Sequence, residues 1–118
     1  MTETRRAHRV GDLILHETAA ILQRHVKDPR VALVTITGVD VSPDLRVAKV
    51  YFSCLDPAAD PNNAYRGLES ARGFIRRELG KHLQLKAVPE LRFIFDTSVD
   101  RGFRLQEVID SVRHDPEE

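Results

Sequence analysis

Two strand-like runs separated by a short turn constrain the fold of this chain more than any other feature. Residues 33–41 and 45–55 are rich in valine, isoleucine and threonine, which favour a pleated, half-buried backbone. Between them, Ser-Pro-Asp at residues 42–44 is typical of a turn, because proline presets φ and the polar side chains bond the local backbone. We expect two antiparallel strands with a connection slightly longer than the tightest hairpin. The side chains that alternate onto one face of the second strand are Ala48, Val50, Phe52 and Cys54.

Helical patterns flank this hairpin. Apolar residues recur at three- and four-residue steps over residues 4–27, which predicts an amphipathic helix that Pro29 ends. A second helix is expected to start at an N-cap at Asn62 or Asn63. Gly73 lies in its middle, and since glycine costs about 1 kcal/mol relative to alanine in a helix, we expect it to interrupt this helix. The apolar stripe of the second helix comprises Leu68, Ile75, Leu79 and Leu83.

A third strand follows, in which Leu91, Phe93 and Phe95 alternate with other residues and Pro89 suits the strand entrance. A short helix is expected over about residues 99–112, and residues 113–118 are expected to form a flexible acidic tail. Three strands with helices on one face make an α+β architecture in a single domain, residues 1–112.

The charges are unevenly distributed although the net charge is zero. Residues 66–92 contain seven basic residues against three glutamates, whereas residues 105–118 contain one arginine against five acids. This asymmetry indicates a basic working face and an acidic tail. Long charged side chains that merely solvate helices would give the same composition.

The most cationic segment surrounds Gly73. A glycine beside exposed helix N–H groups lets a nucleic-acid backbone approach closely, and nearby cations supply counter-charge. The alternative is that Gly73 allows close helix packing and the arginines form a solvated face. A second basic group opens the first helix, where cations oppose the helix dipole. The candidate RNA contacts are Arg72, Gly73, Arg76, Arg77 and Lys81 in the second helix, and Arg5, Arg6 and Arg9 in the first.

Metal binding and catalysis have little support. The five histidines lack metal spacing, and the single cysteine, Cys54, allows no internal disulfide and is expected to pack as a small core residue. No nucleotide-binding glycine pattern or nucleophile elbow occurs, so we expect neither an enzyme nor a cofactor. The absence of a secretory signal and of a membrane span predicts a cytoplasmic chain.

Three segments resemble bacterial ribosome-binding factor A over nearly the whole chain. They are KDPRVALVTITGVDVSPDLRVAKVYFS at residues 27–53, ARGFIRRELGKHLQLKAVPELRF at residues 71–93 and FDTSVDRGFRL at residues 95–105. The ordered combination is specific: an Asp-Pro-Arg helix stop, a Val-Ser-Pro-Asp turn, an Ala-x-Gly helix break and a Pro-Glu-Leu-x-Phe strand.

The resemblance implies a type-II KH-like fold of order α-β-β-α-α-β, with Ala71 and Gly73 in an Ala-x-Gly kink that replaces the usual Gly-x-x-Gly loop. It implies a monomeric, non-enzymatic factor that associates with free 30S subunits, binds 16S rRNA and assists late small-subunit maturation, 5′-end rRNA processing and cold adaptation. Release is linked to a ribosome-associated GTPase. On the same ground, Ala71 and Lys86 are also candidate RNA contacts.

Two other classes remain open from the residues. One is a protein-interaction module that adds a partner strand to an exposed strand edge. The other is a small hydrolase that uses Asp96 or Asp100, which requires one of these acids to lie in a cleft.

Overall fold

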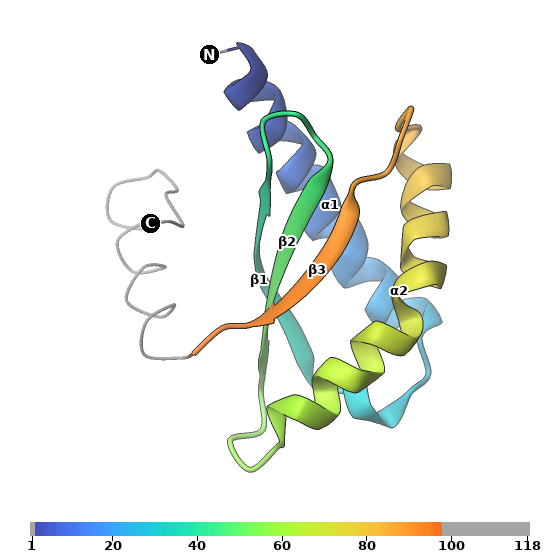
Figure 1. Ribbon diagram of the computed structural model, residues 1–118. Coiled ribbons are helices and arrows are strands. Elements are labelled where there is room, and N and C mark those ends of the chain that lie inside the picture. The colour runs from blue at the N-terminus through green and yellow to red at the C-terminus, as the bar shows by residue number, and fades with distance from the viewer. Residues whose placement is uncertain (1, 98–118) are drawn as a thin grey trace.

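A computed structural model of the chain describes residues 2–97 of the 118 (Figure 1). The chain begins with helix α1 (Thr2–His25) and a 3-10 turn, η1 (Pro29–Val31). Strands β1 (Val34–Val41) and β2 (Val47–Cys54) follow. Helix α2 (Pro61–Leu83) then leads to strand β3 (Glu90–Phe95). The predicted helix at residues 99–112 and the predicted tail at residues 113–118 lie outside the described residues.

The three strands form one sheet in the order β1-β2-β3. β1 pairs with β2 in the antiparallel sense, with an irregularity between Ile36 and Gly38, and β3 pairs with β2 in the parallel sense. Parallel pairing requires a crossover between the two strands, and α2 provides it. Figure 1 shows α1 crossing behind the strands and α2 beside β3.

The core lies between the two helices and one face of the sheet. On this face the predicted alternation is confirmed for Ala48, Val50 and Phe52, which are all fully buried, while Cys54 is only half-buried. Both helices pack against the same cluster of buried apolar side chains. The α+β prediction with helices on one face is therefore confirmed for the described residues. The helix residues of the cluster are Ile14, Ile21 and Leu22 from α1 and Ala64, Leu68, Ile75 and Leu79 from α2.

The hairpin turn has the predicted extra length. The Ser42 N–H donates to the Val47 carbonyl at 2.9 Å, and the Ser42 hydroxyl oxygen accepts from the Arg46 and Val47 N–H groups at 3.2 and 3.1 Å. Leu45 takes a left-handed conformation with φ 63°. This bonding fixes the direction of the Arg46 backbone at the end of the hairpin.

The predicted break at Gly73 is wrong, because α2 is one continuous helix that changes direction along its length (Figure 1). Gly73 has a negative φ and keeps its place in the helix. Burying a leucine or isoleucine contributes about 1.5–3 kcal/mol, and Leu68, Ile75 and Leu79 together outweigh the helix penalty of one glycine.

The predicted N-cap is also wrong. Asp60 caps α2 by accepting a hydrogen bond from the Asn62 N–H at 3.0 Å, and Pro61 occupies the first helical position. Asn62 and Asn63 therefore lie inside the helix. A proline at that position has no N–H to leave unsatisfied, which favours starting the helix there.

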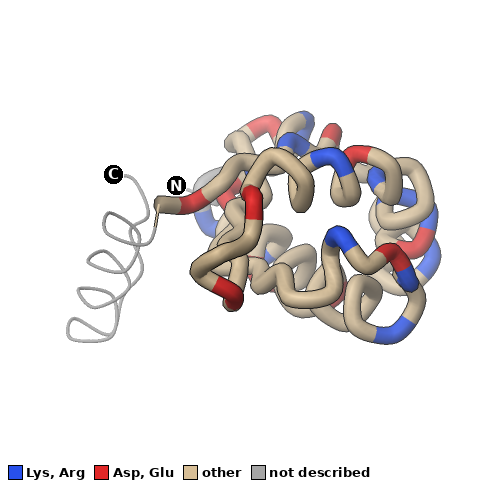
Figure 2. The backbone as a smooth tube through the Cα atoms, turned by 90° about the horizontal axis from the view of Figure 1, so that it is seen from below, with Lys and Arg blue, Asp and Glu red and all other residues tan. Residues whose placement is uncertain are grey.

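The β2–α2 loop, residues 55–60, forms one end of the molecule and carries acidic charges only. No lysine or arginine occurs between Lys49 and Arg66, and the loop contains Asp56 and Asp60. In Figure 2, which views the molecule from this end, the loop is red and tan without blue.

Two glycines of α2 differ in their surroundings and provide a stability test. A Cβ at Gly67 would lie 2.8 Å from Val31 Cγ1 and 2.9 Å from Arg30 Cβ, whereas a Cβ at Gly73 would meet only Arg77 Nη1 at 4.0 Å. We expect Gly67→Ala to lower the free energy of unfolding by about 1 kcal/mol or more through overpacking. Gly73→Ala should raise it by about 0.5–1 kcal/mol through helix propensity. Urea denaturation of the two variants measures both changes in the free energy of unfolding. Equal changes would contradict the difference in packing between Gly67 and Gly73.

Candidate nucleic-acid interface

The arginines of α2 lie against the outer edge of the sheet. Within residues 2–97, β3 is an edge strand, so the outward carbonyls of β3 and of the residues before it have no strand partner there. Arg76 donates from Nη2 to the Val88 carbonyl at 2.8 Å and from Nε to the Pro89 carbonyl at 3.3 Å. Arg72 donates from Nη1 to the Leu91 carbonyl at 3.5 Å. These two predicted RNA contacts therefore also stabilise the fold.

Gly73 lies exposed between these arginines, in an open hollow of about 620 Å³ between α2 and β3. The absence of close neighbours around its Cα excludes the alternative that Gly73 serves close packing within the described residues. Backbone at this position is accessible to a ligand. The hollow is lined by Glu69, Arg72, Gly73, Arg76, Glu90 and Leu91.

The remaining cations of α2 are exposed and less constrained. The Arg77 guanidinium lies 5.9 Å from the centroid of the Phe74 ring, in a cation–π arrangement beside Gly73. Lys81 forms an ion pair with Glu78 at 3.3 Å. Arg72 is likewise paired with Glu69, at 3.4 Å, so only part of the charge of this segment is uncompensated.

The structure brings a second group of cations together from three separate segments. Arg6 of α1, Arg46 of the hairpin turn and Lys86 of the α2–β3 loop line one hollow of about 540 Å³, where Asp44 is the only acid. Arg46 is 3.9 Å from this carboxylate and has an 84% exposed side chain. The hollow reaches Val88, whose carbonyl is bonded to Arg76, so the two groups adjoin.

We call the combined set the basic surface. It contains four predicted contacts of α2 and the loop after it, Arg6 from α1, and Arg46, which the sequence did not indicate as a functional residue. A single arginine in a hairpin turn belongs to no sequence pattern that indicates binding. Only the tertiary fold places Arg46 beside Lys86. The members of the basic surface are Arg6, Arg46, Arg72, Arg76, Arg77 and Lys86, around Gly73.

Other predicted contacts lie elsewhere. Ala71 is half-buried and packs against the core cluster, so its side chain serves packing. Arg5 and Arg9 are exposed on α1 and do not line the hollow that contains Arg6. Lys81 is exposed near the end of α2.

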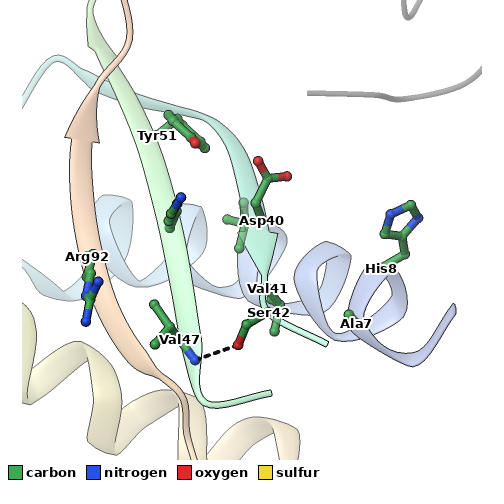
Figure 3. A pocket seen from close by; sticks show the side chains of 10 residues that line it. Ala7, His8, Asp40, Val41, Ser42, Val47, Tyr51 and Arg92 are labelled. Atoms are coloured by element: carbon green, nitrogen blue, oxygen red, sulfur yellow. Dashed lines mark hydrogen bonds between the residues drawn. The ribbon is translucent and has the colours of Figure 1, made fainter. Parts of the chain in front are cut away.

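The uncovered face of the sheet carries a further hollow, of about 570 Å³ (Figure 3). Asp40, Lys49 and Arg92 occupy paired positions across the three strands, so one acid lies in a row with two cations there. Figure 3 shows His8 projecting from α1, apart from the strand side chains. Counting lysine and arginine against aspartate and glutamate, this hollow has one cation in excess, whereas the hollow lined by Arg6, Arg46 and Lys86 has two.

The acids proposed for a hydrolase do not form a catalytic site in the part of the chain that the structure describes. Asp96 is buried and accepts a hydrogen bond from the Thr37 hydroxyl at 2.5 Å, which ties the end of β3 to β1. Asp100 lies outside the described residues. Burial raises the pKa of the Cys54 thiol, and the Asp56 and Asp60 carboxylates add to this shift, so the thiol is a poor nucleophile. Residues 2–97 contain no cluster of side chains suited to a metal ion and no helix that could cross a membrane.

Comparisons with known proteins agree on one family. The family model described as ribosome-binding factor A matches residues 6–109. The ribosome-binding factor A of Syntrophus aciditrophicus is 44% identical over 117 residues, covering 99% of this chain and 95% of the relative.

Solved structures share the fold. The crystal structure of ribosome-binding factor A from Thermus thermophilus superposes with a TM-score of 0.67 at 23% identity, covering 75% of this chain and 93% of that one. A homology model of the Thermus thermophilus protein, fitted into a cryo-EM map of a 30S–RbfA complex, superposes with a TM-score of 0.62 at 23% identity, covering 74% and 91% of the two chains.

The bonds of Arg76 generate a stability prediction. Arg76→Ala removes two hydrogen bonds from a charged donor to carbonyls at the sheet edge, and we expect the free energy of unfolding to fall by about 1–2 kcal/mol. Arg77→Ala serves as the control and should change it by about 0.5 kcal/mol, since its cation–π contact is exposed and long. Thermal or urea denaturation distinguishes them, and equal stabilities would show that the edge contacts contribute nothing.

Proposed function

This chain belongs to the ribosome-binding factor A family, and we propose that its basic surface binds the RNA of free 30S ribosomal subunits. The observation that carries the proposal is that two basic hollows adjoin through the bond of Arg76 to Val88: one lined by Arg6, Arg46 and Lys86, the other by the α2 arginines at the exposed backbone of Gly73. The 30S–RbfA complex of the Thermus thermophilus relative supports the choice of the small subunit. Family membership also supports a non-enzymatic role.

The arginines are suited to phosphate because the fold holds them in place. Arg76 uses Nε and Nη2 for the carbonyls of Pro89 and Val88, which leaves the other N–H groups of its guanidinium for a ligand. A guanidinium already immobilised loses less conformational entropy on binding than a free one. Arg46 and Lys86 add exposed positive charge at the adjoining hollow. Phosphates that contact this surface would release their counterions, which is the main source of salt-dependent affinity.

The finer function follows from the family resemblance. We propose that the RNA contacted is 16S rRNA and that the protein assists late maturation of the small subunit and 5′-end rRNA processing, including cold adaptation. In this proposal it acts in the cytoplasm as a monomer, without a cofactor, and its release is linked to a ribosome-associated GTPase.

A protein-interaction module with an open strand edge is the alternative. The arginines of α2 occupy the Val88, Pro89 and Leu91 carbonyls at the start of β3, which opposes strand addition at that end of the edge. At β1, a Cβ at Gly11 of α1 would lie 3.1 Å from the Val39 carbonyl oxygen, so α1 crowds part of that strand. The RNA-binding role therefore has the stronger support.

Cosedimentation with purified 30S subunits across a salt series tests the proposal. Each phosphate contact contributes about −0.7 to −0.9 to the slope of log affinity against log salt. We expect Arg46→Ala/Arg77→Ala/Lys86→Ala to reduce the magnitude of this slope by about 2–3 and to weaken binding at low salt. These three side chains make no hydrogen bond to the edge of β3, so the fold should persist.

The matched control removes the same charge elsewhere. Arg24, Lys27 and Arg66 are exposed and lie outside the basic surface. Their triple alanine variant should bind 30S subunits with a slope close to that of the wild type. Equal losses in the two triple variants would mean that affinity follows net charge and has no preference for the basic surface.

Gly73→Ala tests whether RNA approaches the backbone. The structure has room for the added methyl group, so the variant should fold at least as stably as the wild type. If RNA contacts the helix backbone here, affinity for 30S subunits should fall by about tenfold, because a methyl group keeps the phosphates at a distance. Unchanged affinity in the stable variant would show that the glycine is not part of the contact.

A further inference from the structure

The end of the molecule that carries the β2–α2 loop combines exposed apolar side chains with acidic charge. Leu33 is 53% exposed and Leu55 is 67% exposed, which makes them the most exposed of the large apolar side chains among the described residues. The Leu55 N–H donates to the Leu33 carbonyl at 2.9 Å, so the two leucines lie at the same end of the β1–β2 ladder. We call Leu33, Leu55, Ala32 and Ala59 the apolar end.

The apolar end borders two hollows. One, of about 220 Å³, lies between η1, the end of β2 and the start of α2, with Leu33, Asp56 and Asp60 in its wall. The other, of about 360 Å³, lies between α1 and β1 and includes Leu55. Apart from Gln23 and Thr35, its lining is apolar, comprising Ala19, Leu22, Val31, Ala32, Val34, Ile36 and Leu55. Concave apolar surface next to exposed leucines is typical of a protein-binding site.

The loop that carries the acids is held in one conformation. Asp56 accepts from the Ala58 N–H at 2.9 Å, and Asp60 caps α2 through the Asn62 N–H at 3.0 Å. The one arginine on the first hollow, Arg30, is held by Asp28 through three hydrogen bonds at 2.6–3.1 Å, so its charge is compensated locally. The apolar end is thus preformed and bears uncompensated negative charge.

The negative charge of Asp56 and Asp60 indicates which kind of partner can bind at the apolar end. RNA phosphates would be repelled by Asp56 and Asp60, and a second copy of this chain docked symmetrically would bring two acidic loops together. A polypeptide with apolar anchors flanked by lysine or arginine satisfies both the hollows and the carboxylates.

We propose that the apolar end is a docking surface for a basic protein segment with apolar anchors, supplied by a protein of the small subunit. This rests on the proposed 30S binding and adds to it a second contact at the end opposite to the basic surface. The protein then bridges RNA and protein within one particle.

The test places a photo-crosslinking amino acid at position 55 in the full chain bound to purified 30S subunits, with position 13 as the control. Leu13 is also an exposed leucine, 44% exposed, but lies on α1 outside both hollows. We expect position 55 to form adducts with a 30S protein through a basic segment, and position 13 to form fewer. Adducts with rRNA, with a second copy, or with residues 98–118 of the same chain would overturn the proposal.

Affinity gives a second, independent measurement. Leu33→Ser/Leu55→Ser should weaken 30S binding by about tenfold with an unchanged salt slope, while Leu13→Ser should leave affinity unchanged. Both variants alter exposed side chains, and their circular dichroism spectra and melting temperatures check the fold. Wild-type affinity in the double variant, with wild-type protein still bound to 30S, overturns this proposal alone. Failure of the wild type to bind 30S subunits overturns the proposed function together with it.

Discussion

Parallel pairing of β2 with β3 is the constraint on which the rest of the structure depends. The two strands can run in the same direction only if the chain returns along the length of the sheet, and the 23 residues of α2 make this return. The apolar stripe of α2 is then buried against Val50, Phe52 and Phe93. With that stripe turned inward, the flank of α2 beside it lies next to the start of β3, where Arg76 bonds the Val88 and Pro89 carbonyls and Arg72 bonds that of Leu91.

The basic surface therefore has a structural origin as well as the proposed functional one. An edge strand leaves backbone carbonyls without strand partners, and guanidinium groups supply donors that can remain partly hydrated. The same side chains keep N–H groups free for phosphate. The same contact protects the sheet edge and presents positive charge, so under the proposed function a change at Arg76 alters stability and RNA affinity together.

Much of the fold could be predicted from residue patterns because those patterns report burial directly. The alternation through Ala48, Val50 and Phe52 and the stop at Pro29 correspond to strand β2 and to the end of the first helix. The continuity of α2 could not be predicted locally, because the penalty of Gly73 is visible in the sequence while the packing that offsets it is tertiary. The N-cap was misplaced for a related reason: Asp60, Asn62 and Asn63 are all suitable caps, and Pro61 decides among them.

The candidate site was predictable only in part. A segment with many basic residues close together, such as residues 72–81, is recognisable from the sequence alone. The approach of Arg6, Arg46 and Lys86 depends on how α1, the hairpin and the α2–β3 loop meet in space, and no local spacing encodes it. The apolar end was missed because Leu33 and Leu55 belong to strand-like runs in which leucine normally signals burial. The ladder ends at these residues, and neither helix covers them.

The separation of charge between the two ends affects how this molecule meets a polyanion. The chain has no net charge, so a distant ribosomal particle exerts little net pull on it. Within about a Debye length, roughly 8–10 Å at physiological salt, the particle acts on the nearer end only: it attracts the basic surface and repels the Asp56–Asp60 loop. Encounters with RNA are therefore favoured when the basic surface comes first and disfavoured when the Asp56–Asp60 loop comes first. A chain with no net charge can thus still distinguish one end from the other on close approach to a polyanion.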